Sequence, residues 1–513
     1  MSEKSVIIIG AGLAGLSTGC YAQMNGYRSH IVEHHSQPGG VAASWRRKDY
    51  LIDGGIHFVM SHKPGSGLYE MYRQLGIVPE VRFTDLTTYG RFVHEPSGRR
   101  VLVTQDLDRL AQDLKALSPA DARMVDELVA ASRAFTGLDM SEVGLSKPRE
   151  LTTPLDQVRD LWAMRPMLKH VVGKYGRSVA EVAREAHDPV LRVFLENLFT
   201  PDVPAYFIFM LLGLLAGGQV GLIEGGSHDF VRAIEKRYRD LGGEITYRAT
   251  VEEILVENEG PGPAVRAGDR AVGVRLAGGG EHRADYVVSA ADGYSTIFKM
   301  LGGRYANDKI RKRYAGWKRF TPLLMASYGV AREFLDEPPF GTLVLDRPLT
   351  IGTQEVPGLF IRIFNYSQRF APPGKTVIQA EFETEWHYWN KLQERDRAGY
   401  DAEKARVAAE VLDRLERYYP GLSAQVEVTD VSTPYTTWRY TQNDRGAWEG
   451  WLMTPKTMMT SIERSLPGLK GFFMAGQWVM PGGGVPPCLY SGQHAVQLLC
   501  HEDGRRFVSS SAG

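Results

Sequence analysis

A glycine-rich turn near the N-terminus constrains the fold of this chain more than any other feature. Its glycines follow the pattern Gly-x-Gly-x-x-Gly, at Gly10, Gly12 and Gly15, between an apolar run at 6–9 and an expected helix at 13–25. The first glycine makes a tight turn, the second lets a pyrophosphate approach the helix N-terminus, and the third lets helix and strand pack closely. Glu33 ends the next expected strand, where a carboxylate accepts hydrogen bonds from ribose hydroxyls. The segment therefore predicts a strand–helix–strand unit that binds a dinucleotide.

Composition excludes several classes of protein. The 513 residues are 43% hydrophobic and 23% charged, which is typical of a globular protein and excludes wholesale disorder. Sixty basic and sixty acidic residues give a net charge of zero, so a nucleic acid is not expected as a partner. The three cysteines suit neither a disulfide framework nor a zinc site, which favours a reducing compartment, and we expect a cytoplasmic protein.

Further glycines are placed as a long cofactor would require. Two pairs follow the acidic residue closely, Gly39 with Gly40 and Gly54 with Gly55. Near the other end, Gly476 follows an apolar run, and three consecutive glycines at 482–484 precede the final expected helix, at 491–499. A glycine loop that opens a helix offers N–H groups and a positive dipole end, which suits the electron-rich pyrimidine edge of a flavin. These segments favour FAD over a nicotinamide.

With these segments in place, the chain resembles the phytoene desaturase, carotenoid isomerase and retinol saturase group of FAD-dependent oxidoreductases, which are related to the monoamine oxidases. The resemblance runs through most of the chain and rests on residues 10–15, 33, 39–40, 53–57, 223–226, 251–254, 284–292, 433–436, 445–447 and 476–492. It implies an α/β fold, in which a Rossmann-like FAD-binding domain is interleaved with a mixed α+β substrate domain. We expect the FAD-binding domain at 1–100, 222–305 and 466–513. The substrate domain, with a helical lid or membrane-contact region, is expected at 101–221 and 306–465.

The resemblance also assigns roles in cofactor binding. In the family, the position matching Val251 contacts the adenine through its backbone, and the segment around Gly476 and Val485 is similar to the one that holds the ribityl chain and isoalloxazine. Together with the glycine patterns, this gives the expected FAD-binding residues: Gly10, Gly12, Gly15, Glu33, Gly39, Gly40, Gly54, Gly55, Val251, Gly476, Gly484 and Val485.

The chain departs from the family pattern at two places. The family has an arginine after the first glycine pair, where this chain has Val41, so one cation near the cofactor is either missing or supplied elsewhere, for example by Arg46 or Arg47. Where many relatives read Gly-Val-Pro-Gly, this chain has Val-Pro-Pro-Cys at 485–488. The segment 54–57 is more similar to the saturase and isomerase branch than to bacterial phytoene desaturases.

The family chemistry moves a hydride between a carbon atom and flavin N5. No paired-carboxylate, Ser/His/Asp or metal-ligand pattern is found in the sequence, which fits hydride transfer with an apolar chain and predicts no metal. His57 is the candidate catalytic residue, because it follows the second glycine pair and could relay a proton or polarise the flavin. A structural histidine bonded to a backbone carbonyl is the alternative. Aromatic side chains suit a polyene, and four are expected to contact the substrate: Tyr435, Trp438, Trp478 and Tyr490.

Three functions are compatible with this pattern. The first is an FAD-dependent desaturase, saturase or isomerase of an apolar polyene or isoprenoid. The second is an FAD-dependent amine oxidase with a small soluble substrate, although the usual flavin-attachment and cage residues of that group are not found here. The third is a flavoprotein without catalytic activity that serves as an assembly scaffold. The sequence names no electron donor or acceptor.

An apolar substrate would be met at a membrane surface, and one segment has the composition for such a contact. Residues 158–175 combine Trp162 and aliphatic side chains with three basic ones, Arg165, Lys169 and Lys174. Apolar and basic residues together are typical of an interfacial segment whose cations meet lipid headgroups. We expect a peripheral membrane contact beside the substrate entrance, with a lid helix packed on the substrate domain as the alternative.

Three further segments bear on how the site is built. Residues 205–223 predict a buried helix followed by a loop, because four glycines and Gln219 interrupt the second half. Apolar residues at 178–199 recur at helical spacing and predict one helix. At 376–382, apolar side chains alternate with Gln379, Glu381 and Glu383, which predicts a strand in a sheet with one solvated face.

Overall fold

The glycine turn lies at the centre of a parallel sheet. The computed structural model describes residues 3–139, 141, 145–257, 268–458 and 460–510. The strand order in this sheet is β10 (Glu244–Thr246), β2 (Tyr27–Val32), β1 (Lys4–Ile9), β14 (Tyr286–Ser289) and β21 (Phe472–Met474). Because β1 is paired on both edges and buried at Val6–Ile9, its apolar run is continuous rather than alternating. The predicted Rossmann-like unit is confirmed.

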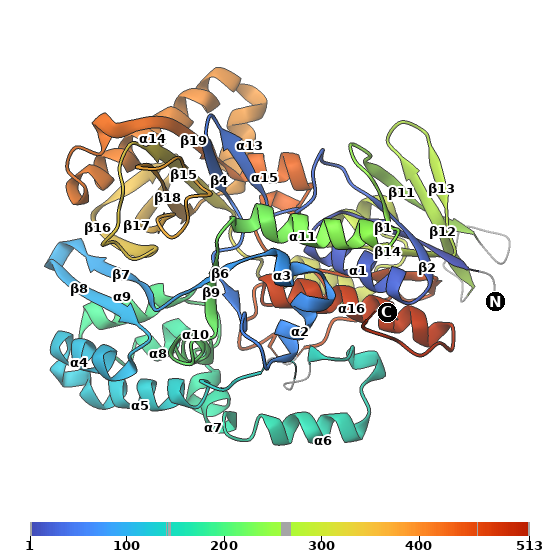
Figure 1. Cartoon of the computed structure of the whole chain (residues 1–513), viewed down its shortest axis with the longest axis horizontal. Helices are drawn as coiled ribbons and strands as arrows, with labels where there is room; N and C mark the ends of the chain where they lie inside the picture. Colours follow the sequence, from blue (N-terminus) through green and yellow to red (C-terminus); the bar gives the residue numbers. More distant parts are fainter. Residues whose placement is uncertain (1–2, 140, 142–144, 258–267, 459, 511–513) are drawn as a thin grey trace.

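Segments from the start, middle and end of the chain cover this sheet together. Three helices lie side by side on it: α1 (Leu13–Met24), α11 (Gly226–Asp240) and α16 (Val485–Glu502) (Figure 1). Two short helices, α2 (Gly67–Gln74) and α3 (Ile77–Glu80), pack nearby. A second sheet flanks the first and contains β11 (Val251–Glu257), β12 (Asp269–Leu276), β13 (Glu281–Arg283) and β20 (Leu469–Lys470). The dinucleotide half is therefore built from widely separated parts of the sequence, as predicted.

A seven-stranded sheet forms the other half of the molecule. Its strand order is β19 (Val426–Ser432), β15 (Leu323–Val330), β18 (Thr376–Glu383), β17 (Gln354–Ile363), β16 (Phe340–Ile351), β7 (Thr88–His94) and β8 (Arg99–Thr104). Helix α14 (Arg397–Tyr418) packs its buried face against this sheet, with α13 (Trp386–Arg395) and α15 (Pro434–Thr441) beside it (Figure 1). β7 pairs with β16, so the chain enters this sheet before residue 100. We propose that the molecule divides into two domains and that the chain first passes from the dinucleotide half into the large sheet at β7.

The prediction of a solvated face at 376–382 is wrong. β18 is buried along seven of its eight residues, and Gln379 and Glu381 are as buried as their apolar neighbours. One face packs on the helices α13 and α14. The other lies under the segment that carries His57, where the polar side chains bond to Arg362. The alternation therefore marks an apolar face and a buried polar face.

A layer of helices closes the lower part of the molecule (Figure 1). It contains α4 (Leu107–Leu117), α5 (Ala122–Arg133), α6 (Pro154–Ala163), α7 (Leu168–Val171), α8 (Val179–Ala183), α9 (Pro189–Leu198) and α10 (Tyr206–Ala216). The single helix predicted at 178–199 is wrong, because Pro189 starts a new helix whose first N–H groups bond to the Asp188 side chain. The buried helix α10 is confirmed, but strand β9 (Val220–Ile223) follows it where a loop was predicted. In the described part of the chain, no helix combines the length and apolarity needed to cross a membrane.

Candidate active site

A cavity of about 1650 Å³ joins the dinucleotide half to the helical layer and the large sheet. It begins at the glycine turn, where the parallel strands have their carboxyl ends, which is the usual ligand position in sheets of this kind. Small-molecule sites typically have volumes of roughly 300–1,000 Å³. The cavity is therefore large enough for a dinucleotide and a second ligand together.

The three glycines of the turn differ in how much space a Cβ atom would have at each position. A Cβ atom at Gly12 would have no neighbour closer than 3.9 Å, so this side of the turn faces open cavity. A Cβ at Gly15 would lie 1.9 Å from the carbonyl oxygen of Gly10. Gly15 therefore allows α1 to pack on the turn and does not itself line the cavity, whereas Gly10 and Gly12 do. This arrangement fits a pyrophosphate held at the α1 N-terminus.

Glu33 is fixed in position beside the turn. Its side chain is 6% exposed and lines the cavity. One carboxylate oxygen accepts a hydrogen bond from Ala11 N (2.6 Å), and the other accepts one from His35 N (2.7 Å). Burial raises the pKa of Glu33, and these two N–H donors oppose the rise. Ribose hydroxyls are donors that fit the remaining acceptor positions of this carboxylate.

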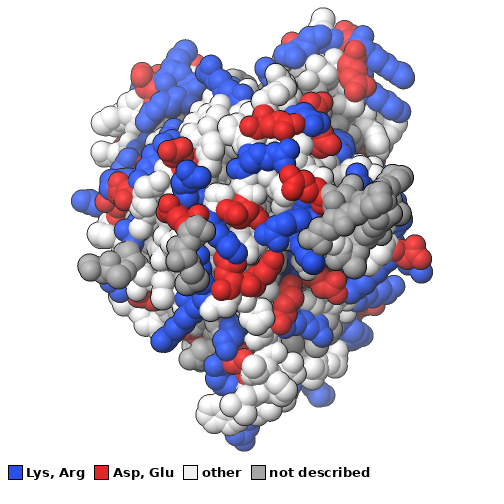
Figure 2. Space-filling view, turned by 90° about the vertical axis from the view of Figure 1, so that its right-hand side faces the viewer, with Lys and Arg blue, Asp and Glu red and all other residues white. Residues whose placement is uncertain are grey.

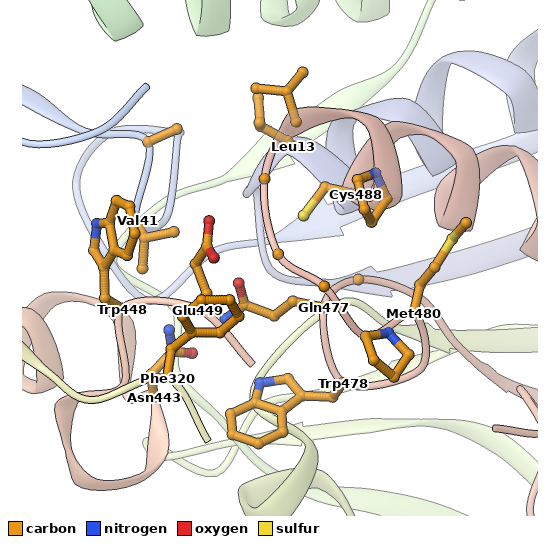
Figure 3. A pocket seen from close by; sticks show the side chains of 18 of the residues that line it. Leu13, Val41, Phe320, Asn443, Trp448, Glu449, Gln477, Trp478, Met480 and Cys488 are labelled. Atoms are coloured by element: carbon orange, nitrogen blue, oxygen red, sulfur yellow. The ribbon is translucent and has the colours of Figure 1, made fainter. Parts of the chain in front are cut away.

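Most of the predicted FAD-binding residues line the cavity: Gly10, Gly12, Glu33, Gly39, Gly40, Gly55, Val251, Gly476, Gly484 and Val485. Gly54 does not, and a Cβ there would lie 2.8 Å from the ring of Trp45. Neither Arg46 nor Arg47 lines the cavity, since both are exposed and Arg47 pairs with Asp430 at 2.6 Å, which leaves the alternative that the cation is missing. Val41 itself lines the cavity, and its side chain is drawn in Figure 3.

The C-terminal glycine loop opens the longest buried helix of the dinucleotide half. Helix α16 begins at Val485, six residues before the predicted start at 491, and Gly484 precedes it with a φ of 87°. This conformation favours glycine. It directs the N-terminus of α16 into the cavity wall, beside Gln477 and Trp478 (Figure 3). Together with the α1 N-terminus, the cavity thus offers two helix N-termini and a buried carboxylate, a set that fits FAD.

The loop that carries His57 is held from two sides. The Asp53 side chain accepts hydrogen bonds from Ser227 N (2.8 Å) at the start of α11 and from Gly55 N (3.0 Å). Arg362, on β17, donates to the carbonyl oxygens of Asp53 (3.1 Å) and Ile56 (3.2 Å). The loop cannot move without breaking these bonds, so the position of His57 is fixed.

His57 faces a buried carboxylate and an aromatic wall. Its Nε2 lies 3.0 Å from an oxygen of Glu381, and its ring lies 5.4 Å from Phe360 and 5.3 Å from Trp448 between centroids. Burial alone would raise the pKa of Glu381, but its contacts with His57 and Arg362 outweigh burial and hold this pKa at about 2. Glu381 is therefore ionised and orients the imidazole in the cavity wall.

The four aromatic residues predicted to contact substrate lie in different places. Trp478 lines the cavity, and its indole nitrogen is buried without a hydrogen-bond partner. Tyr435 and Trp438 lie on α15 and Tyr490 on α16, and none of the three lines the cavity. Their contact with substrate stays a prediction. The apolar end of the cavity is instead lined from the helical layer by Phe135, Leu138, Met164, Met167, Val171, Leu198, Phe199, Phe207 and Met210.

Three charged residues of the site were not predicted from the sequence. Arg362 and Glu381 sit on neighbouring strands and form an ion pair at 3.1 Å. Glu449 lines the cavity between the glycine loop and Trp448. For Glu449, the sequence offers one indication: its carboxylate lies between two tryptophans, in Trp-Glu-Gly-Trp at 448–451.

Comparison with known proteins agrees with this geometry. The family model described as flavin containing amine oxidoreductase matches residues 13–500. Prolycopene isomerase of Daucus carota is 24% identical over 96% of this chain and 79% of its own, and a phytoene desaturase (lycopene-forming) of a Paracoccus species is 23% identical over 97% of each. The all-trans-retinol 13,14-reductase of Danio rerio is 21% identical over 97% of this chain and 85% of its own.

Solved structures show the same fold. Cyclohexylamine oxidase of Brevibacterium oxydans superposes with a TM-score of 0.60 at 15% identity, and the match covers 98% of this chain and 100% of that one. At this identity the likeness concerns the fold alone. The family model, by contrast, spans nearly the whole sequence, from the start of α1 through the His57 loop to α16. The chain therefore belongs to the flavin containing amine oxidoreductases, and it is an FAD-dependent oxidoreductase.

Proposed function

We propose that the protein transfers a hydride between flavin N5 and a carbon atom of an apolar polyene or isoprenoid-like substrate, in a desaturation, saturation or cis–trans isomerisation. This proposal rests on the apolar end of the cavity, where leucine, methionine, valine and phenylalanine side chains of the helical layer form most of the wall. Such a wall binds an extended hydrocarbon by excluding water. The names of the carotenoid and retinoid relatives support the same substrate class.

The roles of the chain's own residues follow from their positions. FAD, when bound, supplies the hydride acceptor or donor. Gly12 and Glu33 would hold its pyrophosphate and ribose, and the α16 N-terminus would face its pyrimidine edge. Trp448 and the His57 ring would form one wall of the reaction site, while Glu381 keeps the imidazole oriented. The apolar end orients the substrate and excludes water, which prevents side reactions.

Anaerobic assays with purified, FAD-loaded protein test this proposal. Oxidised and dithionite-reduced enzyme would each be mixed with phytoene, prolycopene and all-trans-retinol in detergent, with product analysis by chromatography. We expect conversion of at least one polyene. Putrescine and cyclohexylamine form the second arm, because the ionised carboxylate of Glu381 lines the cavity and could bind an ammonium group. Bleaching of the flavin by an amine, with no polyene converted, would replace the proposal with an amine oxidase.

We also propose that the α6–α7 region contacts a membrane beside the substrate entrance. Along α6, four apolar side chains at helical spacing point into solvent: Leu155, Val158, Leu161 and Trp162, the last of them 73% exposed. Two basic residues, Arg165 and Lys169, are exposed beside them. Figure 2 shows the lower end of this face, where α6 lies, with mostly uncharged side chains and basic ones around them. Met164, Met167 and Val171 of the same region line the cavity, so the surface lies at its rim.

Flotation with anionic liposomes checks the membrane contact. Wild-type protein should float at low salt, because apolar insertion and attraction of cations to anionic lipid act together. The double variant Trp162→Ala with Lys169→Glu should stay at the bottom. A double variant at exposed, distant residues, Leu335→Ala with Lys309→Glu, serves as the control and should float like the wild type. Wild-type protein that does not float at either salt concentration would remove the contact and favour a lid helix.

A further inference from the structure

Glu449 occupies the junction between the flavin segment and the aromatic wall. A Cβ atom at Gly483 would lie 1.8 Å from one of its carboxyl oxygens, and a Cβ at Gly450 would lie 2.4 Å from the carbonyl oxygen of Gln477. Residues 449–450 therefore pack closely against the segment 477–483 that leads into α16. Figure 3 shows the Glu449 carboxyl pointing into the cavity, beside Gln477 and close to Trp448. The carboxyl is thus placed in the same part of the cavity as the expected flavin.

No cation compensates this carboxyl in the part of the chain that the structure describes. Glu449 forms no ion pair there, unlike Glu381 with Arg362 and His57. The titratable group that faces it is the thiol of Cys488 on α16, whose pKa is raised to about 12 by burial and by Glu449. Burial raises the pKa of Glu449 to about 8, against a single opposing contribution from the Gly484 N–H. At neutral pH the Glu449 carboxyl therefore carries a proton.

Two of the carboxyls that line the cavity thus have opposite protonation states. Glu381 is ionised beside His57, and Glu449 is neutral and adjoins Trp448, whose ring lies 5.3 Å from the imidazole between centroids. When surroundings separate the pKa values of two groups in one site, the group with the raised value is suited to donate a proton. A hydride transfer that makes or removes a carbon–carbon double bond needs such a group, because one of the two hydrogens moves as a proton.

We propose that Glu449 is the acid–base residue of this site, which gives its proton to a substrate carbon when a double bond is saturated and takes it back in the reverse direction. The inference rests on the proposed function. In saturation, one carbon of the double bond forms a C–H bond with the carboxyl proton, and the other forms a C–H bond with the hydride from reduced flavin N5. The C=C π bond is lost, Glu449 becomes a carboxylate, and the flavin is oxidised by two electrons. An external two-electron donor of the reduced nicotinamide class must restore the flavin, and solvent must return the proton.

The first test needs no substrate. The midpoint potential of the bound flavin would be measured between pH 6 and 9.5 by equilibration with dyes, for wild type and for Glu449→Gln. A carboxyl beside the flavin that loses its proton near pH 8 makes the potential of the wild type depend more steeply on pH above that point. Glu449→Gln, which cannot titrate, should lack this change of slope, and the distant control Glu502→Gln should retain it. Equal slopes in wild type and Glu449→Gln would overturn the assignment, even if polyenes are converted.

Infrared spectra and single-turnover rates complete the test. Wild-type holoenzyme at pH 7 should show a protonated carboxyl band that disappears above pH 8 and is missing in Glu449→Gln. With all-trans-retinol and dithionite-reduced enzyme, Glu449→Gln should react about 100-fold more slowly or worse. Glu449→Asp should recover part of the rate, because it retains an acid. A wild-type band that persists in Glu449→Gln would overturn the proposal, while an intact change of slope without conversion of any polyene would count against the proposed function only.

Discussion

Replacement of Arg362 by leucine should lower the stability of the protein by about 3–5 kcal/mol, the cost of removing one partner of a buried ion pair. Arg362 is 1% exposed and donates hydrogen bonds to Gln379 and Glu381 as well as to the His57 loop. Without it, the Glu381 carboxylate stays buried with His57 as its remaining partner. Thermal melts of the FAD-loaded protein should therefore shift down by several degrees.

Two control variants separate the charge from the packing. Arg275→Leu removes an arginine whose side chain is 42% exposed and which pairs with Glu281, so it should cost no more than about 1 kcal/mol. The double variant Arg362→Leu with Glu381→Leu removes both charges of the buried pair and should be more stable than Arg362→Leu alone. If the single buried variant melts like Arg275→Leu, the ion pair does not hold the His57 loop.

The same pair makes stability depend on acid pH. The folded pKa of Glu381 is about 2, below its ordinary value of 4.5, so the unfolded chain takes up the proton first as the pH falls. The stabilisation is fully present above pH 4.5 and is lost as the pH falls toward 2. Thermal melts across this range should show a steeper loss for the wild type than for Arg362→Leu with Glu381→Leu.

The dinucleotide half could be predicted because its information is local. The turn, its flanking strand and helix, and Glu33 lie within the first 33 residues, and the glycine spacing marks the turn in any chain that binds a dinucleotide there. The later segments were then placed by resemblance, and most of them line the cavity. The prediction for helix α16 is too short, because the glycines and prolines before residue 491 suggest a loop, whereas proline is well accommodated in the first turn of a helix.

The polar part of the site could not be predicted, because it depends on contacts between distant segments. Glu381 alternates with apolar neighbours, and this pattern is the same whether its face meets water or a buried arginine. Only the position of Arg362 on the next strand, and of the His57 loop above it, makes that face buried. Likewise, the raised pKa of Glu449 depends on the absence of a cation among its described neighbours, which no local pattern records.

Replacement of Gly12 by valine should abolish FAD binding while leaving the fold intact. Gly12 has a φ of −70° and a ψ of 177°, a conformation that valine adopts readily, and the nearest atom to an added Cβ is 3.9 Å away. The added side chain therefore fills space that the pyrophosphate needs, without displacing protein atoms. The purified variant should show no flavin absorbance, and the melting temperature of its apoprotein should match that of wild-type apoprotein.

The neighbouring glycine and the acidic residue give contrasting controls for this prediction. Gly15→Val should fail to fold, because a Cβ there would lie 1.9 Å from the carbonyl oxygen of Gly10. Glu33→Ala should fold but bind FAD about tenfold more weakly or worse, since a hydrogen bond to a charged group contributes roughly 1.5–3 kcal/mol. FAD titration of the apoproteins, followed by flavin fluorescence, measures each effect. Full FAD occupancy in both Gly12→Val and Glu33→Ala would contradict the placement of the pyrophosphate and ribose at this turn, because each variant alters a different contact with the same half of the cofactor.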